Sequence, residues 1–136
     1  MKTTLTLILV ALIGASNAVA QQSGESFEQF LSQFASDAAF RVSRTSDPLP
    51  VQIGSELVSE VLKEKWPASR VAAKTAPLLS KQGLSAQGLQ QRITKLGARE
   101  IEVFQYREEA DSYMITYRFE LRNGKWYLAA YLDESM

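Results

Sequence analysis

The side chains able to take part in catalysis are few, because the 136-residue chain contains no cysteine and no histidine. These absences exclude a thiolate nucleophile, a Ser/His/Asp triad, a disulfide scaffold and a metal site built on thiolate or imidazole. The remaining type of general base is a carboxylate whose pKa is raised by desolvation, with a tyrosine that stabilises an oxyanion. Glu102 with Tyr106, Tyr113 or Tyr117 is the best combination, and Asp47 is a poorer second base. No cofactor and no metal is expected.

The combination depends on a β-meander that we expect at residues 99–107, 112–122 and 125–132. Asn123-Gly124 is the preferred dipeptide of a two-residue type I′ hairpin turn, so it fixes the register of the last two strands. The facing pairs are then Arg122–Lys125, Leu121–Trp126, Phe119–Leu128 and Tyr117–Ala130.

The turn at residues 108–111 decides which way Glu102 points. An even number of turn residues sets Glu102 opposite Tyr117 and Tyr106 opposite Tyr113 on the inner face, whereas an odd number turns Ile101 and Val103 inward. We expect the even number, which gives an acid and several tyrosine hydroxyls on an apolar concave wall. For the role of these residues, the favoured interpretation is not catalytic: Glu102 is exposed at a strand end, and the tyrosines are core aromatics with their hydroxyls at the rim.

Arg44 allows a similar choice. It follows Phe40 and Val42 on one face of a short strand that we expect to end at the prolines of residues 47–50. Arg44 either pairs with a buried carboxylate such as Glu102, which orders the fold, or offers a bidentate anchor to an anionic ligand at the pocket mouth. The structural pair is the favoured interpretation.

The opposite face of the meander carries Met114, Arg118, Tyr127 and Tyr131 and is apolar for a face exposed to solvent. Monomers seldom expose large contiguous apolar patches, so one interpretation is a two-fold dimer that pairs sheet with sheet. The other interpretation is a set of scattered exposed tyrosines.

Two amphipathic helices are expected to cover the inner face. Ser26 fits the N-cap of the first, whose apolar stripe runs from Phe27 to Ala38. Ser85 fits the cap of the second, and Gly97 fits its end; the buried stripe is Leu89, Ile93 and Leu96. Residues 51–66 fit a helix or a strand pair, and residues 66–77 fit a loop with one helical turn.

The N-terminal twenty residues have the pattern of a secretory signal peptide. Lys2 precedes an apolar run from Leu5 to Ile13, and Ala18-Val19-Ala20 fits a cleavage site before Gln21. The run is too short to cross a membrane, which needs about 20 apolar residues, so no transmembrane segment is expected in the mature chain. Residues 21–136 are then a single domain in a periplasm or outside the cell.

The charge is balanced overall but unevenly distributed. Residues 63–99 contain eight basic residues and one acidic residue. Clustered basic residues bind anionic surfaces or nucleic acids, but this segment has few aromatic residues among the charges. A solvated face is therefore the favoured interpretation, and nucleic acid is not an expected partner.

Several short segments share an order of aromatic residues and turns: Phe27-Glu28-x-Phe30, Asp37-x-x-Phe40-Arg41-x-Ser43-Arg44, Pro48-Leu49, Lys63-Glu64-Lys65-Trp66, Tyr117-x-Phe119 and Gly124-Lys125-Trp126-Tyr127-Leu128. Together they resemble a family of secreted bacterial domains of unknown function, number 4348, whose known members have the nuclear transport factor 2-like (cystatin-like) fold. The resemblance implies an α+β cone, in which a curved antiparallel sheet is packed on helices, and a strand near residues 56–63. The Ala- and Pro-rich residues 67–77 depart from the pattern, and no catalytic residues are implied.

Three hypotheses about function follow. The first is a secreted or periplasmic noncatalytic module that binds an unknown small molecule or protein in a small apolar pocket. The second is a small-molecule isomerase or dehydratase-like enzyme with Glu102 as base. The third is an anion or polyanion binder that uses residues 63–99.

Overall fold

The first helix begins where the sequence places its cap. In a computed structural model, which describes residues 24–54, 60–71 and 80–135, helix α2 spans Phe27–Ser36. The Ser26 hydroxyl accepts a hydrogen bond from the backbone N–H of Gln29 at 3.4 Å and satisfies one of the free donors of the first turn. The buried face of α2 carries Phe30, Leu31 and Phe34, as the apolar stripe predicts.

The strand expected around Phe40 and Val42 was wrong, because residues Ala38–Ser43 form helix α3. The Asp37 carboxylate caps this helix by accepting from the backbone N–H of Phe40 at 3.1 Å. A good N-cap therefore outweighs an apolar alternation of only four residues, which is too short to define a strand. The strand associated with the prolines begins later, as β1 at Leu49–Ile53.

The helix expected from Ser85 to Gly97 was also wrong. Helix α5 spans Lys81–Gln87, and Ser80 caps it by accepting from the backbone N–H of Gly83 at 2.9 Å. Gly88 has a left-handed conformation (φ 65°), which ends the helix. Strand β3 follows at Gln90–Gly97, so the Ile93 and Leu96 of the expected helical stripe lie in a strand and are exposed.

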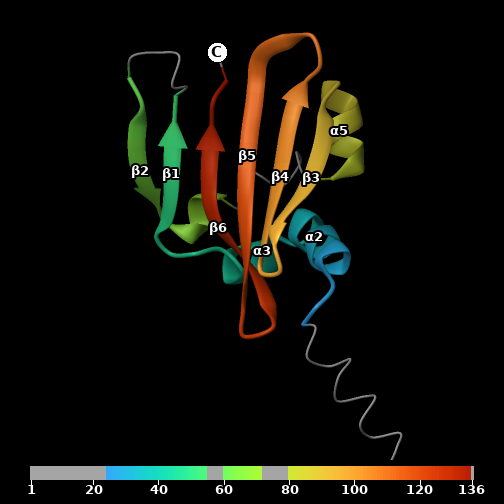
Figure 1. The fold of residues 1–136 in the computed structure, drawn as a ribbon, viewed down its shortest axis with the longest axis vertical. Helices are drawn as coiled ribbons and strands as arrows, with labels where there is room; N and C mark the ends of the chain where they lie inside the picture. Colours follow the sequence, from blue (N-terminus) through green and yellow to red (C-terminus); the bar gives the residue numbers. More distant parts are fainter. Residues whose placement is uncertain (1–23, 55–59, 72–79, 136) are drawn as a thin grey trace, which may run out of the picture.

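Six strands form one sheet in the order β2-β1-β6-β5-β4-β3 (Figure 1). The expected meander is confirmed as β4 at Glu100–Arg107, β5 at Ala110–Arg122 and β6 at Lys125–Asp133. Strand β2 at Leu62–Trp66 pairs antiparallel with β1, so these described residues of the ambiguous segment form a strand pair. Strands β1 and β6 pair in parallel, and all other neighbours are antiparallel. Residues 55–59 and 72–79 lie outside the described residues, and 68–71 form one helical turn.

The β5–β6 hairpin confirms the turn and part of the register. Asn123 and Gly124 both have positive φ (50° and 76°), as a type I′ turn requires, and Phe119 pairs with Leu128. A bulge between Arg118 and Phe119 then shifts the register, so that Tyr117 pairs with Tyr131. The expected Tyr117–Ala130 pair was therefore wrong by one residue.

The turn between β4 and β5 has the expected even count, because Arg107 pairs with Ala110 across two turn residues, but the facing pairs expected from that count were wrong. An irregularity between Tyr106 and Arg107 shifts the register, so that Val103 pairs with Tyr117 and Glu102 pairs with Arg118. Ile101 and Val103 consequently point into the core, where they are at most 4% exposed. This register buries two aliphatic side chains and spares Glu102 the cost of desolvating a carboxylate.

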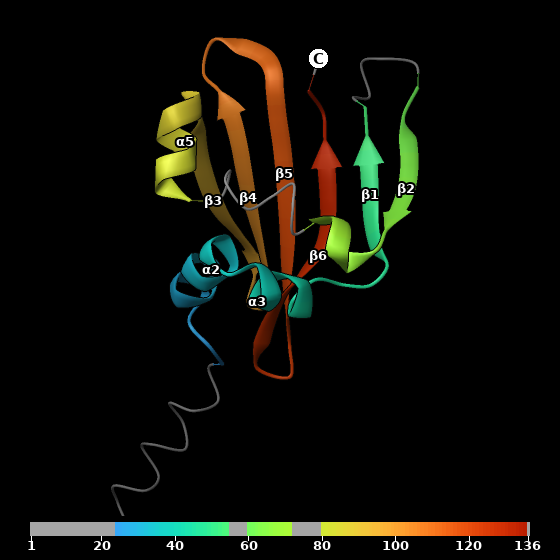
Figure 2. The same ribbon diagram turned by 180° about the vertical axis from the view of Figure 1, so that it is seen from behind.

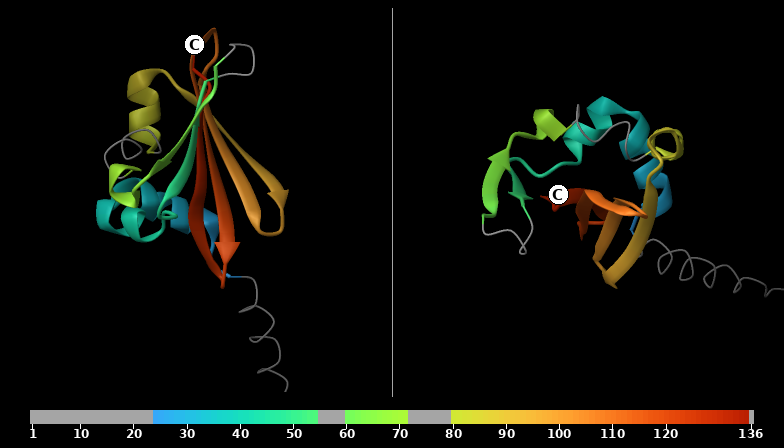
Figure 3. Two further views of the ribbon diagram at one scale, coloured as in Figure 1. Left: turned by 90° about the vertical axis from the view of Figure 1, so that its left-hand side faces the viewer. Right: turned by 90° about the horizontal axis from the view of Figure 1, so that it is seen from above.

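All the described helices lie on one face of the curved sheet, as the expected α+β fold class requires (Figure 3). Helices α2 and α3 cover the lower part of this concave face, and α5 lies beside β3 (Figure 2). The core between the layers is built from the aromatic rings of α2 and the inner residues of the strands, including Phe30, Phe34, Tyr117 and Phe119. The expected signal peptide, residues 1–20, lies outside the described residues, among which there is no helix of the length and apolarity that spanning a membrane requires.

Replacing Gly54 by alanine should destabilise the protein. Gly54, at the end of β1, has φ 113°, and a Cβ atom there would lie 2.7 Å from the carbonyl oxygen of Glu60. We expect the free energy of unfolding in urea to fall by about 1–3 kcal/mol, from backbone strain and this contact. Gly97→Ala is the matched control, because a Cβ atom at Gly97 meets nothing within 4 Å. Equal effects of the two substitutions would contradict the argument.

Candidate functional site

The five residues expected to line one pocket do not gather at one site. Because the register between β4 and β5 differs from the expected one, Glu102 and Tyr106 lie on the convex face of the sheet, while Tyr113 and Tyr117 lie on the concave face. Arg44 lies at the end of α3, near the β5–β6 turn. Asp47, the second candidate base, is exposed. No base–tyrosine pair from the sequence therefore shares a cavity in the described residues.

Glu102 has a structural neighbour on the convex face. Its carboxylate lies 3.7 Å from the guanidinium of Arg118, and both side chains are partly exposed. On the same face, the rings of Phe104 and Tyr106 stack with centroids 5.0 Å apart, and the Arg92 guanidinium lies 5.3 Å from the Phe104 ring. Glu102 is thus part of a mixed polar and aromatic surface.

Four residues were expected on the convex face, and the prediction was wrong for Tyr131. The β6 bulge turns its ring inward, where it is 7% exposed and packs between Trp66 at 5.3 Å and Tyr117 at 5.4 Å. Met114 pairs with Tyr106 and Arg118 pairs with Glu102, so both lie on the convex face. Tyr127 lies near the β5–β6 turn, 5.7 Å from the Arg44 guanidinium.

Arg44 makes an internal ion pair, but its partner is Glu25 and not Glu102. Nη1 of Arg44 donates to Glu25 Oε1 and also to the carbonyl oxygen of Trp126, the latter at 3.2 Å. The same carboxylate accepts from the backbone N–H of Trp126 at 2.7 Å. The Arg44 side chain is 13% exposed, and its guanidinium lies 4.7 Å from the Phe40 ring. These contacts satisfy the guanidinium inside the protein, as the structural interpretation requires.

Arg41 is a buried cation that the sequence analysis did not single out. Its side chain is 2% exposed, and Nη1 donates to the carbonyl oxygen of Phe34. Desolvation lowers the pKa of this guanidinium, while the nearby Asp37 carboxylate acts in the opposite direction. In the part of the chain that the structure describes, its Nε has no hydrogen-bond partner, and Arg41 does not line either of the two pockets described below.

The buried hydroxyls of Tyr113 and Tyr117 have no hydrogen-bond partner among the described residues. Burial, reinforced by the Asp133 carboxylate, raises the pKa of Tyr113 to about 12. Burial also raises the pKa values of Tyr117 and Tyr131, and the neighbouring tyrosines and Asp133 contribute to the increase. All three side chains therefore stay neutral hydrogen-bond donors well above the usual range for tyrosine.

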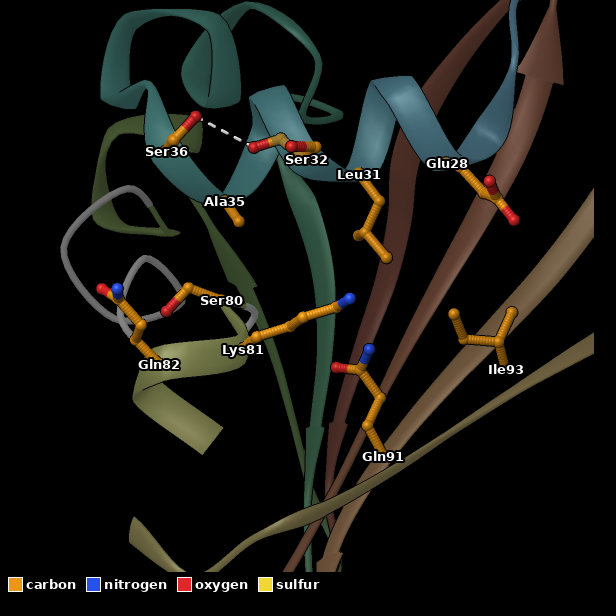
Figure 4. A pocket seen from close by; sticks show the side chains of 10 residues that line it. All are labelled: Glu28, Leu31, Ser32, Ala35, Ser36, Ser80, Lys81, Gln82, Gln91 and Ile93. Atoms are coloured by element: carbon orange, nitrogen blue, oxygen red, sulfur yellow. Dashed lines mark hydrogen bonds between the residues drawn. The ribbon is translucent and has the colours of Figure 1, made fainter. Parts of the chain in front are cut away.

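A groove lies between α2, α5 and β3, away from the expected pocket; we call it the α2–α5–β3 groove. Its volume is about 700 Å³. Figure 4 shows side chains from α2 on one side and from α5 and β3 on the other. The lining residues are Glu28, Leu31, Ser32, Ala35, Ser36, Ser80, Lys81, Gln82, Gln91 and Ile93. A smaller, more open depression of about 280 Å³ lies near the β4–β5 turn, beside Gly88 and Arg107.

The chemistry of the groove is that of an apolar wall with one cation. Leu31 and Ala35 of α2 face Ile93 of β3, and the Lys81 side chain extends from α5 toward Gln91 (Figure 4). Lys81 forms no ion pair with any described residue. Gln91 is positioned by its neighbour in the sheet, since its side-chain oxygen accepts from Gln105 Nε2 at 2.8 Å. The carboxylate of the groove is Glu28, on α2.

Sequence reasoning missed this groove because it placed the second helix too late in the chain. The available signal was the pair Ser80 and Gly88, which fit an N-cap and a left-handed helix end as well as Ser85 and Gly97 do. The basic segment 63–99 does not form one surface either, because Lys63 and Lys65 lie on β2 and Arg92 and Lys95 on β3, the two outer strands. In the part of the chain that is described, no cluster of three or more acidic residues could hold a metal ion.

The comparisons with known proteins agree with this fold. A protein-family model whose description names no activity matches residues 25–135. The chain belongs to that family. No curated protein shows significant sequence similarity to the chain.

Solved structures show the nuclear transport factor 2-like (NTF2-like) fold. An NTF2-like protein from Bacteroides fragilis matches with a TM-score of 0.62 and 18% identity over 83% of this chain and 48% of that one. This chain thus spans about half the length of that protein. Two weaker matches are an NTF2-like protein of unknown function from Silicibacter pomeroyi (TM-score 0.45, 10% identity, 96% and 100% of the two chains) and a domain of unknown function with a cystatin-like fold from Nostoc punctiforme (TM-score 0.40, 10% identity, 95% and 80%). At these identities the likeness concerns the fold alone.

The raised tyrosine pKa values predict a loss of stability in alkali. The folded state holds the phenolic protons of Tyr113, Tyr117 and Tyr131 above pH 10, where the unfolded chain releases them, so the free energy of unfolding falls as the pH rises from 10 toward 12. Tyr113→Phe should reduce the slope by at most about 1.4 kcal/mol per pH unit, measured by urea unfolding. Tyr106→Phe, on the convex face, is the control. A stability that is constant over this range would contradict the argument.

Proposed function

We propose that this chain is a secreted, noncatalytic binding module of the bacterial domains of unknown function numbered 4348, and that the α2–α5–β3 groove is its ligand site. The observation that carries the proposal is the combination of apolar walls, Leu31, Ala35 and Ile93, with the ammonium of Lys81, which forms no ion pair with a described residue. Concave sites with mostly apolar walls and a few placed polar groups are typical ligand sites.

The expected ligand is an amphipathic anion. Its apolar part would lie against Leu31, Ala35 and Ile93, and its anionic group would meet Lys81, with the Gln91 amide as a further hydrogen-bonding group. Because Lys81 has no carboxylate partner among the described residues, an incoming anion does not have to displace an existing ion pair. An anion in the groove therefore gains a charge-assisted contact with Lys81.

An isomerase or dehydratase activity has less support. Glu102, the expected base, lies on the convex face beside Arg118, and the buried hydroxyls of Tyr113 and Tyr117 do not line the groove. A general base must reach the proton that it removes, either directly or through one water molecule. A binding role requires no such pair.

Export through a cleaved signal peptide is part of the same proposal. Its support is the charged start, short apolar run and Ala18-Val19-Ala20 pattern of the N-terminus. Mass determination of the exported protein should give a chain that begins at Gln21, and an exported protein that retains residues 1–20 would contradict this part.

Binding of 8-anilinonaphthalene-1-sulfonate, an amphipathic anion, tests the groove. We expect saturable fluorescence enhancement, with an affinity about tenfold weaker in Lys81→Glu, where the groove cation becomes an anion. Ala35→Trp should also weaken binding by filling the groove. Lys63→Glu, the same charge change on β2, is the matched control and should bind like the parent protein. Equal losses in Lys63→Glu and Lys81→Glu, with near-ultraviolet circular dichroism unchanged, would refute the assignment.

We also propose that the convex face forms a two-fold dimer. Its centre carries the Phe104–Tyr106 stack and Met114, which no described helix covers, and Arg92, Glu102 and Arg118 lie around it. A two-fold axis in the interface that passes midway between Glu102 and Arg118 would set each Arg118 against the Glu102 of the other copy.

Size-exclusion chromatography with light scattering tests the dimer. We expect a dimer for the parent protein and a monomer for Tyr106→Lys, since an ammonium in the apolar centre would be buried beside the Arg92 guanidinium, a like charge. Leu62→Lys, on the far edge of the sheet, should remain dimeric. A monomeric parent protein would refute this proposal.

A further inference from the structure

Strand β3 leaves one edge of the sheet unpaired. It is the last strand in the order β2-β1-β6-β5-β4-β3 and pairs only with β4 among the described strands. Every residue from Arg92 to Arg99 is exposed. The free N–H and C=O groups along such an edge are able to pair with another extended segment.

The edge runs beside the α2–α5–β3 groove. Ile93 pairs with the buried Val103, so its side chain points to the concave side, where it lines the groove together with Leu31 and Ala35. Ile93 is nevertheless 48% exposed, and Leu96, at a bulge further along the strand, is 47% exposed. A strand added at this edge would cover apolar surface that the protein itself leaves open.

Apart from Glu28 of α2, the charged residues of this edge and groove are basic. Arg92 lies on the convex side over the ring of Phe104, Lys95 lies on the concave side, and Lys81 extends into the groove. None of the three forms an ion pair with a described residue. The edge is therefore complementary in charge to an acidic segment.

We propose that the natural occupant of the groove is an extended acidic peptide of a partner protein, which adds to β3 as a further strand. The inference rests on the proposed function, because it names the class of ligand of the same groove. Successive side chains of a strand alternate between its two faces. The partner's acidic residues would then meet Arg92 on the convex side. On the concave side its apolar residues would lie against Ile93 and Leu31, and an acidic residue at the groove would meet Lys81.

A second copy of this chain fits the same edge less well. Pairing β3 with β3 would bring Arg92 and Lys95 of both copies to one junction, and like charges on adjacent strands are destabilising. The basic residues thus disfavour self-association of the edge and at the same time favour an acidic partner.

Fluorescence anisotropy of a labelled nine-residue peptide of alternating Glu and Val tests the proposal. We expect saturable binding that weakens as salt is added. In a strand, alternate residues direct their amides toward the neighbouring strand, so N-methylation of one alternate set of residues should weaken binding about tenfold, while N-methylation of the other set should leave it unchanged. Equal affinities of both methylated peptides would show that no strand is added.

Two surface variants locate the site. Ile93→Glu should weaken peptide binding about tenfold, whereas Leu62→Glu, an exposed leucine on the other outer strand, should leave it unchanged. If the peptide does not bind while 8-anilinonaphthalene-1-sulfonate still binds in a manner that depends on Lys81, this inference is refuted and the proposed function stands. If neither probe binds, both are refuted. Equal losses of peptide affinity in Ile93→Glu and Leu62→Glu would also overturn the assignment of the β3 edge.

Discussion

The ion pair between Glu25 and Arg44 determines where the helical layer meets the sheet. Glu25 directly precedes the cap of α2, and Arg44 follows the last residue of α3, so the pair joins the two ends of the helical unit. Both residues also bind the main chain of Trp126 on β6. Backbone hydrogen bonds from Glu25 to Gly124 at 3.0 Å and from Leu128 to Arg44 at 2.7 Å attach the same ends to the β5–β6 hairpin. Loss of either charge would leave the other largely buried without its partner, which is costly.

This attachment explains the distribution of the core. With both ends of the α2–α3 unit held at the lower end of the sheet, the aromatic face of α2 is directed onto β5 and β6. The Phe30 and Phe34 rings each lie 5.5 Å from the ring of Phe119, and Phe27 lies 5.2 Å from Trp126. Such edge-to-face contacts add to the free energy of burial. The groove lies beside this covered region, between α2, α5 and β3.

Local signals in the sequence predicted the elements that depend on local physics. The cap at Ser26, the turn at Asn123-Gly124 and the alternation of the meander each act within a few residues, and each is found in the structure. The registers across the sheet were less accessible, because one extra residue in a bulge reverses every side chain beyond it. The bulge in β6 turns Tyr131 into the core. The irregularity beside the β4–β5 turn places Val103, and not Glu102, opposite Tyr117. Both registers depend on which side chains the whole sheet can bury. The position of the candidate site depends on these registers, so it could not be predicted from local patterns either.

The parallel pairing of β1 with β6 has a consequence for the order of assembly. Among the described strands, β6 alone joins the β2–β1 pair to the β5–β4–β3 part of the sheet, so these two parts are connected in the sheet only after β6 has been synthesised. Contacts of such long sequence separation slow folding, since a large loop must close before they form. A chain built in this way cannot complete its sheet until β6 has been synthesised.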